Sequence, residues 1–159
     1  MKKLFLMAVG FLIAISASAQ FEKGKYYCSG SLTGLSLSYS GAEKLSLGVE
    51  AKGGYLLADN WMALAMAGYS HEENVDDKFS VGVGGRYYIV DNGLYMGVNA
   101  RLVHGGSGYN DFMPGIELGY AFFLGKSVTI EPAVYYDQSI KNHSDYSKVG
   151  LRIGVGVYL

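Results

Sequence analysis

The sequence predicts an all-β protein, a single eight-stranded antiparallel transmembrane β-barrel preceded by a cleavable signal peptide. Three observations lead to this fold class. A short apolar segment with a basic start opens the chain. Apolar residues then alternate with polar or small ones in runs of about ten residues, as in membrane-spanning strands. Short and long connections alternate between these runs, as in outer-membrane barrels.

The composition is unusual for a soluble enzyme. The chain has 159 residues, enough for one domain. Half of the residues are hydrophobic, but only 17% are charged, against roughly 25% in an ordinary soluble domain. The formal charge of −1 argues against a nucleic-acid partner, because such a partner requires a clustered basic surface.

Residues 1–19 have the pattern of a secretory signal peptide. Two lysines precede an apolar stretch over residues 4–15, and small residues then lead to a predicted cleavage site before Gln20. We therefore expect residues 20–159 to form the barrel domain. A single cysteine, Cys28, cannot form an internal disulfide, and we interpret it as a small residue in a strand.

The last run, residues 148–159, shows the alternation most clearly. One face carries Val149, Leu151, Ile153, Val155, Val157 and Leu159. The other face carries Lys148, Gly150, Arg152, Gly154, Gly156 and Tyr158. The aliphatic face suits lipid and the other suits a narrow lumen.

Five further runs show the same division: residues 44–57, 79–89, 94–104, 112–124 and 128–137. Their apolar faces carry no charged residue. A lipid-facing wall requires this, because an Arg or Lys at mid-bilayer costs about 2–4 kcal/mol.

Two less regular runs complete the set of eight strands. Residues 27–39 change parity by one position near Gly34, which predicts a β-bulge. Residues 61–70 are apolar on both faces, and we expect Met62, Leu64 and Met66 to point outward with the alanines inward. Pro132 lies inside its run and predicts a bulge or local break.

The connections predict the orientation in the membrane. The tight turns at residues 58–60, 91–93 and 125–127 are expected in the periplasm, and the longer polar stretches 71–78, 105–111 and 138–147 outside the cell. The short hairpin at residues 40–42 falls on the outer side. Aromatic residues near the strand ends predict two interfacial girdles: Tyr55, Trp61, Tyr87 and Phe122 below, and Tyr39, Phe79, Phe112 and Tyr136 above.

The inward faces predict a charge network in the lumen. We expect Glu50, Arg101, Glu117 and Arg152 near mid-height, and Arg86 with Glu131 in a lower layer beside Tyr88 and Tyr135. A hairpin centred on residue 109 would place Arg101 directly opposite Glu117. An eight-stranded barrel is just wide enough for side chains to fill, so this predicts a paired plug that conducts little. A small-solute channel is the alternative.

Two segments resemble a known family. Residues 79–102, FSVGVGGRYYIVDNGLYMGVNARL, resemble the Arg-Tyr-Tyr strand–turn–strand of the outer-membrane β-barrel domain family. Its members are small eight-stranded proteins, similar to OmpX and the OmpA barrel, of Gram-negative bacteria of the Bacteroidota kind. The C-terminus resembles the barrel-assembly signal at Arg152, Gly154, Val157 and Leu159, although Leu159 stands where an aromatic residue is usual.

The resemblance implies an integral outer-membrane location, insertion by the barrel-assembly machinery, and contact with outer-membrane lipids and lipopolysaccharide. It implies no reaction. We therefore expect a structural or surface-interaction role in the cell envelope, with no catalytic, cofactor-binding or metal-binding residues.

Three further alternatives stay open at this point. A lipid A-modifying enzyme of the outer leaflet would use a His with a Ser and an acid near the outer rim. Its candidates are His71, His104 and His143, with Ser107, Ser144, Asp111 and Asp145 nearby, and His104 lies on the lipid-facing parity.

The acidic stretch Glu72, Glu73, Asp76 and Asp77 could hold a divalent cation. A secreted lipocalin-like barrel, the rival fold, would instead place apolar side chains inside and charges outside.

Overall fold

The structure is a computed structural model that describes residues 21–35, 46–72, 75–89, 93–106, 108–141 and 147–159. These residues form nine β-segments of one antiparallel sheet. The segments are β1 Tyr26–Leu35, β2 Ser46–Ala58, β3 Trp61–Glu72, β4 Val75–Tyr88, β5 Leu94–Gly105, β6 Tyr109–Tyr120, β7 Phe122–Phe123, β8 Val128–Asp137 and β9 Lys148–Tyr158. Among the described residues, no helix has the length and apolar character needed to cross a bilayer.

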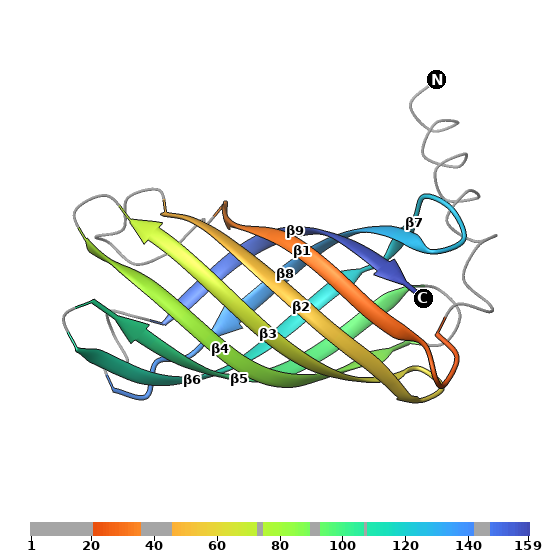
Figure 1. Cartoon of the computed structure of the whole chain (residues 1–159), viewed down its shortest axis with the longest axis horizontal. Coiled ribbons are helices and arrows are strands. Elements are labelled where there is room, and N and C mark those ends of the chain that lie inside the picture. Colours follow the sequence, from red (N-terminus) through yellow and green to blue (C-terminus); the bar gives the residue numbers. More distant parts are fainter. Residues whose placement is uncertain (1–20, 36–45, 73–74, 90–92, 107, 142–146) are drawn as a thin grey trace, which may run out of the picture.

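The sheet closes on itself. Each strand from β1 to β6 pairs with the next, β1 also pairs with β9, and β6 also pairs with β8. Since Ala121 alone separates β6 from β7, the two segments form one interrupted strand, and the barrel has eight strands (Figure 1). The prediction of an eight-stranded antiparallel barrel is confirmed.

The two ends of the barrel differ. One end, the turn end, carries the tight connections β2–β3 and β7–β8 together with Phe21 and Leu159, on the right of Figure 1. There Asn60 has a φ of 65° and Gly93 a φ of 78°, left-handed conformations that Asn and Gly tolerate best in tight turns. The opposite end is the loop end. At that end, residues 138–141 and 147 lie outside the strands, in the connection expected over residues 138–147.

Strands extend further toward the loop end than the sequence pattern predicts. The expected loops 71–78 and 105–111 are largely strand, because β3 runs to Glu72, β4 starts at Val75, β5 ends at Gly105 and β6 starts at Tyr109. Polar residues there hide the alternation of hydrophobicity, while the backbone pairing continues. The expected hairpin at residues 40–42 lies outside the described residues.

Side chains alternate between the lumen and the outer wall. In β8 every second residue is buried. The outer wall carries exposed aliphatic residues such as Val83 and Val98, which are 65% and 64% exposed. The lumen is lined by buried charged and tyrosine side chains. This is the reverse of a soluble barrel with an apolar lumen, and an apolar surface of this extent requires lipid around it.

The expected facing of β3 is wrong. Met62, Leu64 and Met66 are buried in the lumen, and the alanines between them face outward. Leu64 pairs with Gly54 on one side and Gly84 on the other. These glycines leave room for long side chains inside the barrel. Both faces of β3 are apolar, so its own sequence pattern could not decide between them.

The expected β-bulge in the first strand is confirmed. The pairing of β1 with β9 shifts its register between Thr33 and Leu35, which places the extra residue at Gly34. Before the shift, the side chain of Ser31 is buried in the lumen and that of Leu32 is exposed on the outer wall.

We expected a bulge or break in the strand that contains Pro132, but the break lies in the neighbouring strand. Gln138 N donates to Pro114 O across the β6–β8 seam, and hydrogen-bonded pairs recur every second residue in antiparallel sheets. Pro132 therefore stands where an N–H would donate to Tyr120. β8 itself is continuous, but β6 ends at Tyr120 and the strand resumes only at Phe122.

A substitution in β9 tests the assignment of the two faces. Ile153 lies midway along the strand and is 48% exposed on the outer wall. Ile153→Arg should lower the free energy of unfolding in lipid vesicles by about 2–4 kcal/mol. Urea unfolding followed by the fluorescence of Trp61 measures it. Ile153→Leu is the matched control, and equal stability of the two variants would contradict the outward facing.

Candidate functional site

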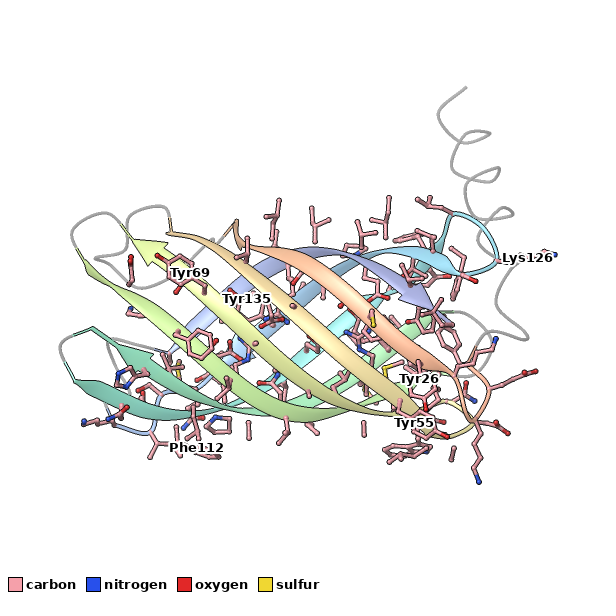
Figure 2. All side chains as sticks on the ribbon, viewed as in Figure 1. Tyr26, Tyr55, Tyr69, Phe112, Lys126 and Tyr135 are labelled. Atoms are coloured by element: carbon pink, nitrogen blue, oxygen red, sulfur yellow. The ribbon has the colours of Figure 1, made fainter. Side chains whose placement is uncertain are left out.

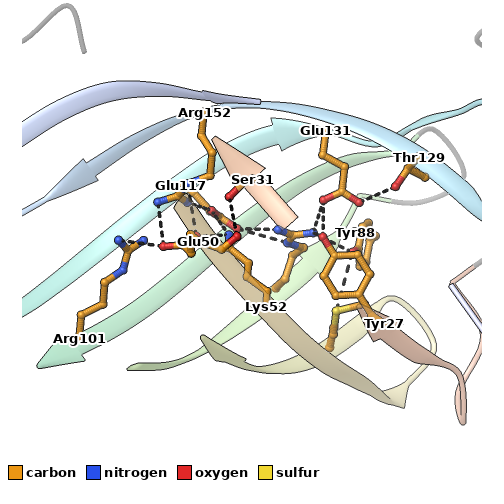
Figure 3. Close-up of polar contacts among 12 residues, drawn as sticks. Tyr27, Ser31, Glu50, Lys52, Tyr88, Arg101, Glu117, Thr129, Glu131 and Arg152 are labelled. Atoms are coloured by element: carbon orange, nitrogen blue, oxygen red, sulfur yellow. Dashed lines mark hydrogen bonds and ion pairs between the residues drawn. The ribbon is translucent and has the colours of Figure 1, made fainter. Parts of the chain in front are cut away.

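A network of ion pairs crosses the barrel lumen (Figure 3). It joins four cationic and four anionic side chains, all buried: Lys52, Arg86, Arg101, Arg152, Glu50, Glu117, Glu131 and Asp137. These side chains come from six strands on all sides of the barrel. Buried charges require such pairing, because an unpaired one costs several kcal/mol.

Arg86 occupies the part of the network nearest the turn end. Its guanidinium is 1% exposed and bridges two carboxylates, with Nη2 2.9 Å from Glu117 Oε1 and Nη1 2.9 Å from Glu131 Oε2. The guanidinium carbon lies 3.8 Å from the centre of the Tyr95 ring, within cation–π distance. Arg86 thus links strands β4, β6 and β8 through one planar group.

Glu117 and Glu50 form the middle of the network. Glu117 accepts hydrogen bonds from three cations: Arg86, Lys52 Nζ at 3.0 Å and Arg152 Nη1 at 2.7 Å. Glu50 Oε2 lies 3.1 Å from Arg101 Nη1, and Glu50 Oε1 lies 3.4 Å from Arg152 Nε. Each carboxylate therefore holds several strands together.

The network is less complete toward the loop end. Arg101 Nη1 lies 3.4 Å from Asp137 Oδ2. Within the described part of the chain, Arg101 Nε and Nη2, Asn99 Oδ1 and Asp137 Oδ1 are buried without a hydrogen-bond partner. In the middle of the network the same holds for Glu50 Oε1 and Arg152 Nε, which lie 3.4 Å apart. The tighter half of the plug is therefore the half around Arg86.

The expected contact between Arg101 and Glu117 is wrong. Arg101 pairs with Met113, and Glu117 pairs with Gly97. Paired residue numbers in β5 and β6 centre on residue 107 and not on 109, so the two charges lie at different heights. Both side chains have other partners, Arg101 with Glu50 and Glu117 with Arg86.

All six residues expected in the lumen network lie in the lumen, and the structure adds two. Lys52 and Asp137 share the charged parity of their strands with Glu50 and Glu131. The same alternation could therefore have predicted that Lys52 and Asp137 belong to the lumen network. Tyr135, expected as a filler, is buried beside Arg152, whose guanidinium carbon lies 4.4 Å from the ring centre.

Tyrosines close the lumen below Arg86. Tyr27 Oη donates to Glu131 Oε2 at 2.6 Å, and Tyr158 Oη donates to Glu131 Oε1 at 3.1 Å. The hydroxyls of Tyr88 and Tyr158 lie 2.7 Å apart. Each ring fills space while its hydroxyl satisfies a charge, so the layer is apolar in bulk and polar at its tips.

Phe21 closes the mouth of the turn end. Its side chain is 5% exposed, and its ring stacks on Tyr88 with the centroids 3.8 Å apart. Edge contacts join the same ring to Tyr158 and Phe123. The backbone is held as well, because Asn60 N donates to Phe21 O at 2.9 Å.

The residues of the expected assembly signal lie on both faces of the last strand. Arg152 belongs to the lumen network, and Gly154 is buried beside Ser31. Val157 is partly buried, and Leu159 is 71% exposed at the turn end. Leu159 and Tyr26 exchange backbone hydrogen bonds, which pair the end of the chain with the first strand.

Few of the expected enzyme residues are described. His143, Ser107, Ser144 and Asp145 lie outside the described residues, as does the side chain of His71. His104 is exposed on the outer wall, with Nδ1 2.6 Å from Asn110 Oδ1. Asp111 is buried and accepts hydrogen bonds from Ser139 Oγ and Lys141 N.

The acidic stretch expected as a possible cation site is also only partly described. Glu73 lies outside the described residues, as do the side chains of Glu72 and Asp76. Asp77 accepts a hydrogen bond from Tyr69 Oη at 2.7 Å. Within the described ranges, no group of three or more His, Cys, Asp and Glu side chains could hold a metal ion.

Comparison with solved structures shows the same architecture in small outer-membrane barrels. Neisserial surface protein A aligns at a TM-score of 0.57 and 14% identity, over 85% of this chain and 97% of that one. Ail of Yersinia pestis in a phospholipid nanodisc aligns at 0.56 and 13%, over 86% and 100%. A designed transmembrane β-barrel aligns at 0.55 and 14%, over 87% and 98%. No family model and no curated protein matches the sequence.

The fold, the outer wall and the lumen together define the class of protein. A closed eight-stranded barrel has an apolar exterior and a charged interior, and its structural neighbours are outer-membrane barrels. The chain is an integral outer-membrane β-barrel protein.

Replacing Arg86 tests how much the network contributes to the free energy of unfolding. Arg86→Met leaves Glu131 and Glu117 without the cation that bridges them, and should lower the free energy of unfolding by about 3–5 kcal/mol. Adding Glu131→Gln should recover part of that loss, because the two residues are coupled. Lys126→Met, at an exposed turn position, is the control. Additive effects in urea unfolding would contradict the coupling.

Proposed function

We propose that this protein has a structural or surface-interaction role in the cell envelope and that a charge-paired plug closes its lumen. The observation that carries the proposal is the network of four cations and four anions across the lumen. We further propose that it belongs with the small OmpX-like and OmpA-like barrels of the Bacteroidota kind, which its Arg-Tyr-Tyr segment resembles.

The composition of the network supports a plug more than an ion pathway. The four cations and four anions of the network balance, so the network itself offers no excess of either sign to attract a counter-ion. Moving any one member breaks contacts with several strands, because Glu117 alone accepts hydrogen bonds from three cations. The tyrosine layer and Phe21 seal the lumen below the network. A small-solute channel, the alternative, would need an open polar path through both layers.

The orientation follows the general pattern of outer-membrane barrels, which place short turns in the periplasm and longer loops outside. We propose that the turn end lies in the periplasm and that the loop end faces the exterior. Aromatic side chains are exposed on the outer wall near both ends, such as Tyr55 at the turn end and Phe112 at the loop end (Figure 2). Trp61 at the start of β3 and Phe79 in β4 are exposed as well. Any surface partner would then bind the loop end, and the assembly machinery would recognise the strand that ends at Leu159.

A non-catalytic role is part of the proposal. The described ring contact of His104 is to an amide oxygen, not to a serine that it could activate as a general base. Mass spectrometry of lipid A from cells with and without the protein separates the two functions. Identical profiles are expected, and a protein-dependent change in acylation would favour the lipid-modifying enzyme.

Planar-bilayer recording tests the plug. The purified wild-type protein should give no large, stable single-channel currents, because side chains fill the lumen. Replacing Arg86 and Glu131 together by alanine removes both ion pairs of Arg86, keeps the net charge of the network, and should raise the frequency of current events. Lys126→Ala, outside the lumen, should leave the recordings unchanged. Large, stable wild-type currents would rule out the plug.

Cysteine labelling of intact cells tests the orientation. In a Cys28→Ser background, Lys141→Cys at the loop end should react with a membrane-impermeant maleimide. Lys126→Cys at the turn end (Figure 2) should react only after the outer membrane is permeabilised. Both positions are exposed, so accessibility in the folded protein is matched. Labelling of position 126 alone in intact cells would invert the proposed orientation.

A further inference from the structure

The loop-end part of the lumen network holds buried polar atoms that its ion pairs do not use. Arg101, Asn99 and Asp137 are only 9%, 8% and 6% exposed. Among the described residues, Arg101 Nε and Nη2, Asn99 Oδ1 and Asp137 Oδ1 have no hydrogen-bond partner. Buried polar atoms in folded proteins are nearly always satisfied, because an unsatisfied one costs its full desolvation. The ion pairs alone therefore do not account for this part of the network.

Strand register brings the unused atoms together. Asn99 pairs with Gly115, and Gly115 pairs with Asp137, so the two acceptor side chains come from strands on either side of one glycine. A Cβ at Gly115 would collide with Asp137 Oδ1 and would lie 2.9 Å from Asn99 Oδ1. Both oxygens therefore converge over this glycine. The other oxygen of Asp137 lies 3.4 Å from Arg101 Nη1, so the guanidinium is beside the same carboxylate.

Arg101 offers one edge of its guanidinium to a ligand. Its Nη1 is already paired with Glu50 and Asp137. The unused Nε and Nη2 lie along another edge, where two parallel N–H bonds match the two oxygens of a carboxylate. Figure 3 shows Arg101 at the end of the network furthest from Glu131 and Tyr27. The unused edge therefore lies in the half of the network toward the loop end.

A ligand that satisfies all of these atoms must carry both an acceptor group and a donor group. A carboxylate satisfies Arg101 Nε and Nη2, and an ammonium group, which only donates, satisfies Asn99 Oδ1 and Asp137 Oδ1. An anion alone would leave the two oxygens without a donor, and a cation alone would leave the guanidinium edge without an acceptor. A zwitterion also adds no net charge to a network in which four cations balance four anions.

The surroundings of the site favour a compact ligand that enters from the loop end. Gly82 and Gly84 pair with Arg101 and Asn99, so β4 contributes no side chain beside either residue. At the other end of the barrel, the tyrosine layer and Phe21 close the lumen. The site is therefore a dead end and not part of a pathway across the barrel.

We propose that the loop-end half of the lumen binds a small amino acid, a zwitterion with adjacent carboxylate and ammonium groups. The carboxylate accepts two hydrogen bonds from Arg101, and the ammonium group donates to Asn99 and Asp137 over Gly115. This binding site goes beyond the structural role proposed above. Ligand binding is measured at Arg101 and Gly115, whereas a failure of the plug appears as electrical current, so the two proposals can fail separately.

Titration of the purified, isotope-labelled protein with glycine in detergent micelles, followed by NMR, tests the site. The Arg101 Nε–H signal and the Gly115 backbone amide signal should shift and then saturate as glycine is added. Acetate and methylammonium each carry only one of the two charged groups of glycine. Each should bind roughly tenfold more weakly than glycine, the scale of one charged hydrogen bond. Acetate binding as tight as glycine binding would indicate a plain anion site, and shifts that do not saturate would indicate water alone; either result overturns the proposal.

Variants locate the site within the lumen, with the Gly115 amide as the readout. Arg101→Lys keeps the positive charge near Glu50 but loses the Nε–Nη2 edge, and should weaken glycine binding by roughly tenfold. Asn99→Leu removes one acceptor and should also weaken it. Thr129→Val is the matched control, because it removes a buried lumen hydroxyl at the turn end, and it should bind glycine like the wild type. Far-ultraviolet circular dichroism establishes that each variant is folded. Unchanged binding in Arg101→Lys, or an equal loss in Thr129→Val, would overturn the assignment.

Discussion

The structure depends on one constraint, that backbone donors and acceptors surrounded by hydrocarbon must be paired within the protein. A sheet meets it only by closing, and the chain closes through β1–β9 and β6–β8. Both prolines lie at the β6–β8 seam, at Pro114 and Pro132, so the missing donors fall in one interface. Beside that seam Ala121 N donates to Gly93 O on the β5 side, which keeps the interrupted strand attached.

Closure with eight strands then dictates the lumen. The interior is narrow, so large side chains need small residues opposite them. Gly119 faces the Tyr95 ring and Gly150 faces the Tyr135 ring so closely that a Cβ at either glycine would collide with the tyrosine. The narrow lumen also excludes bulk water from the charged side chains, and ion pairs compensate for the lost hydration. Because the partners come from different strands, the network forms only in the closed barrel and in turn braces it.

The two faces of the wall serve different purposes. The charged side chains of the lumen network form ion pairs with one another, so few of their polar atoms are available to bind a solute. The outer wall is apolar except near its rims, where aromatic side chains mark the transition from lipid to water. At the loop end, His104 and Asn110 form a polar pair on the outer wall, in the row of residues that also contains Phe79. Interaction with the envelope is therefore better placed at the rims than in the lumen.

The alternation of side chains between the two faces of each strand could be predicted from the sequence alone. A period of two assigns each residue of a strand to one face, so the barrel, the inward charges such as Glu50 and Arg152, and the bulge at Gly34 were all predictable. Which charges form ion pairs could not be predicted, because these contacts depend on hairpin length and on barrel closure. Arg101 pairs with Glu50 and not Glu117 for that reason. The pairing of β3 with its neighbours set its facing, because its two faces are equally apolar. Hairpin register aligned Phe79, His104 and Asn110 across β4, β5 and β6.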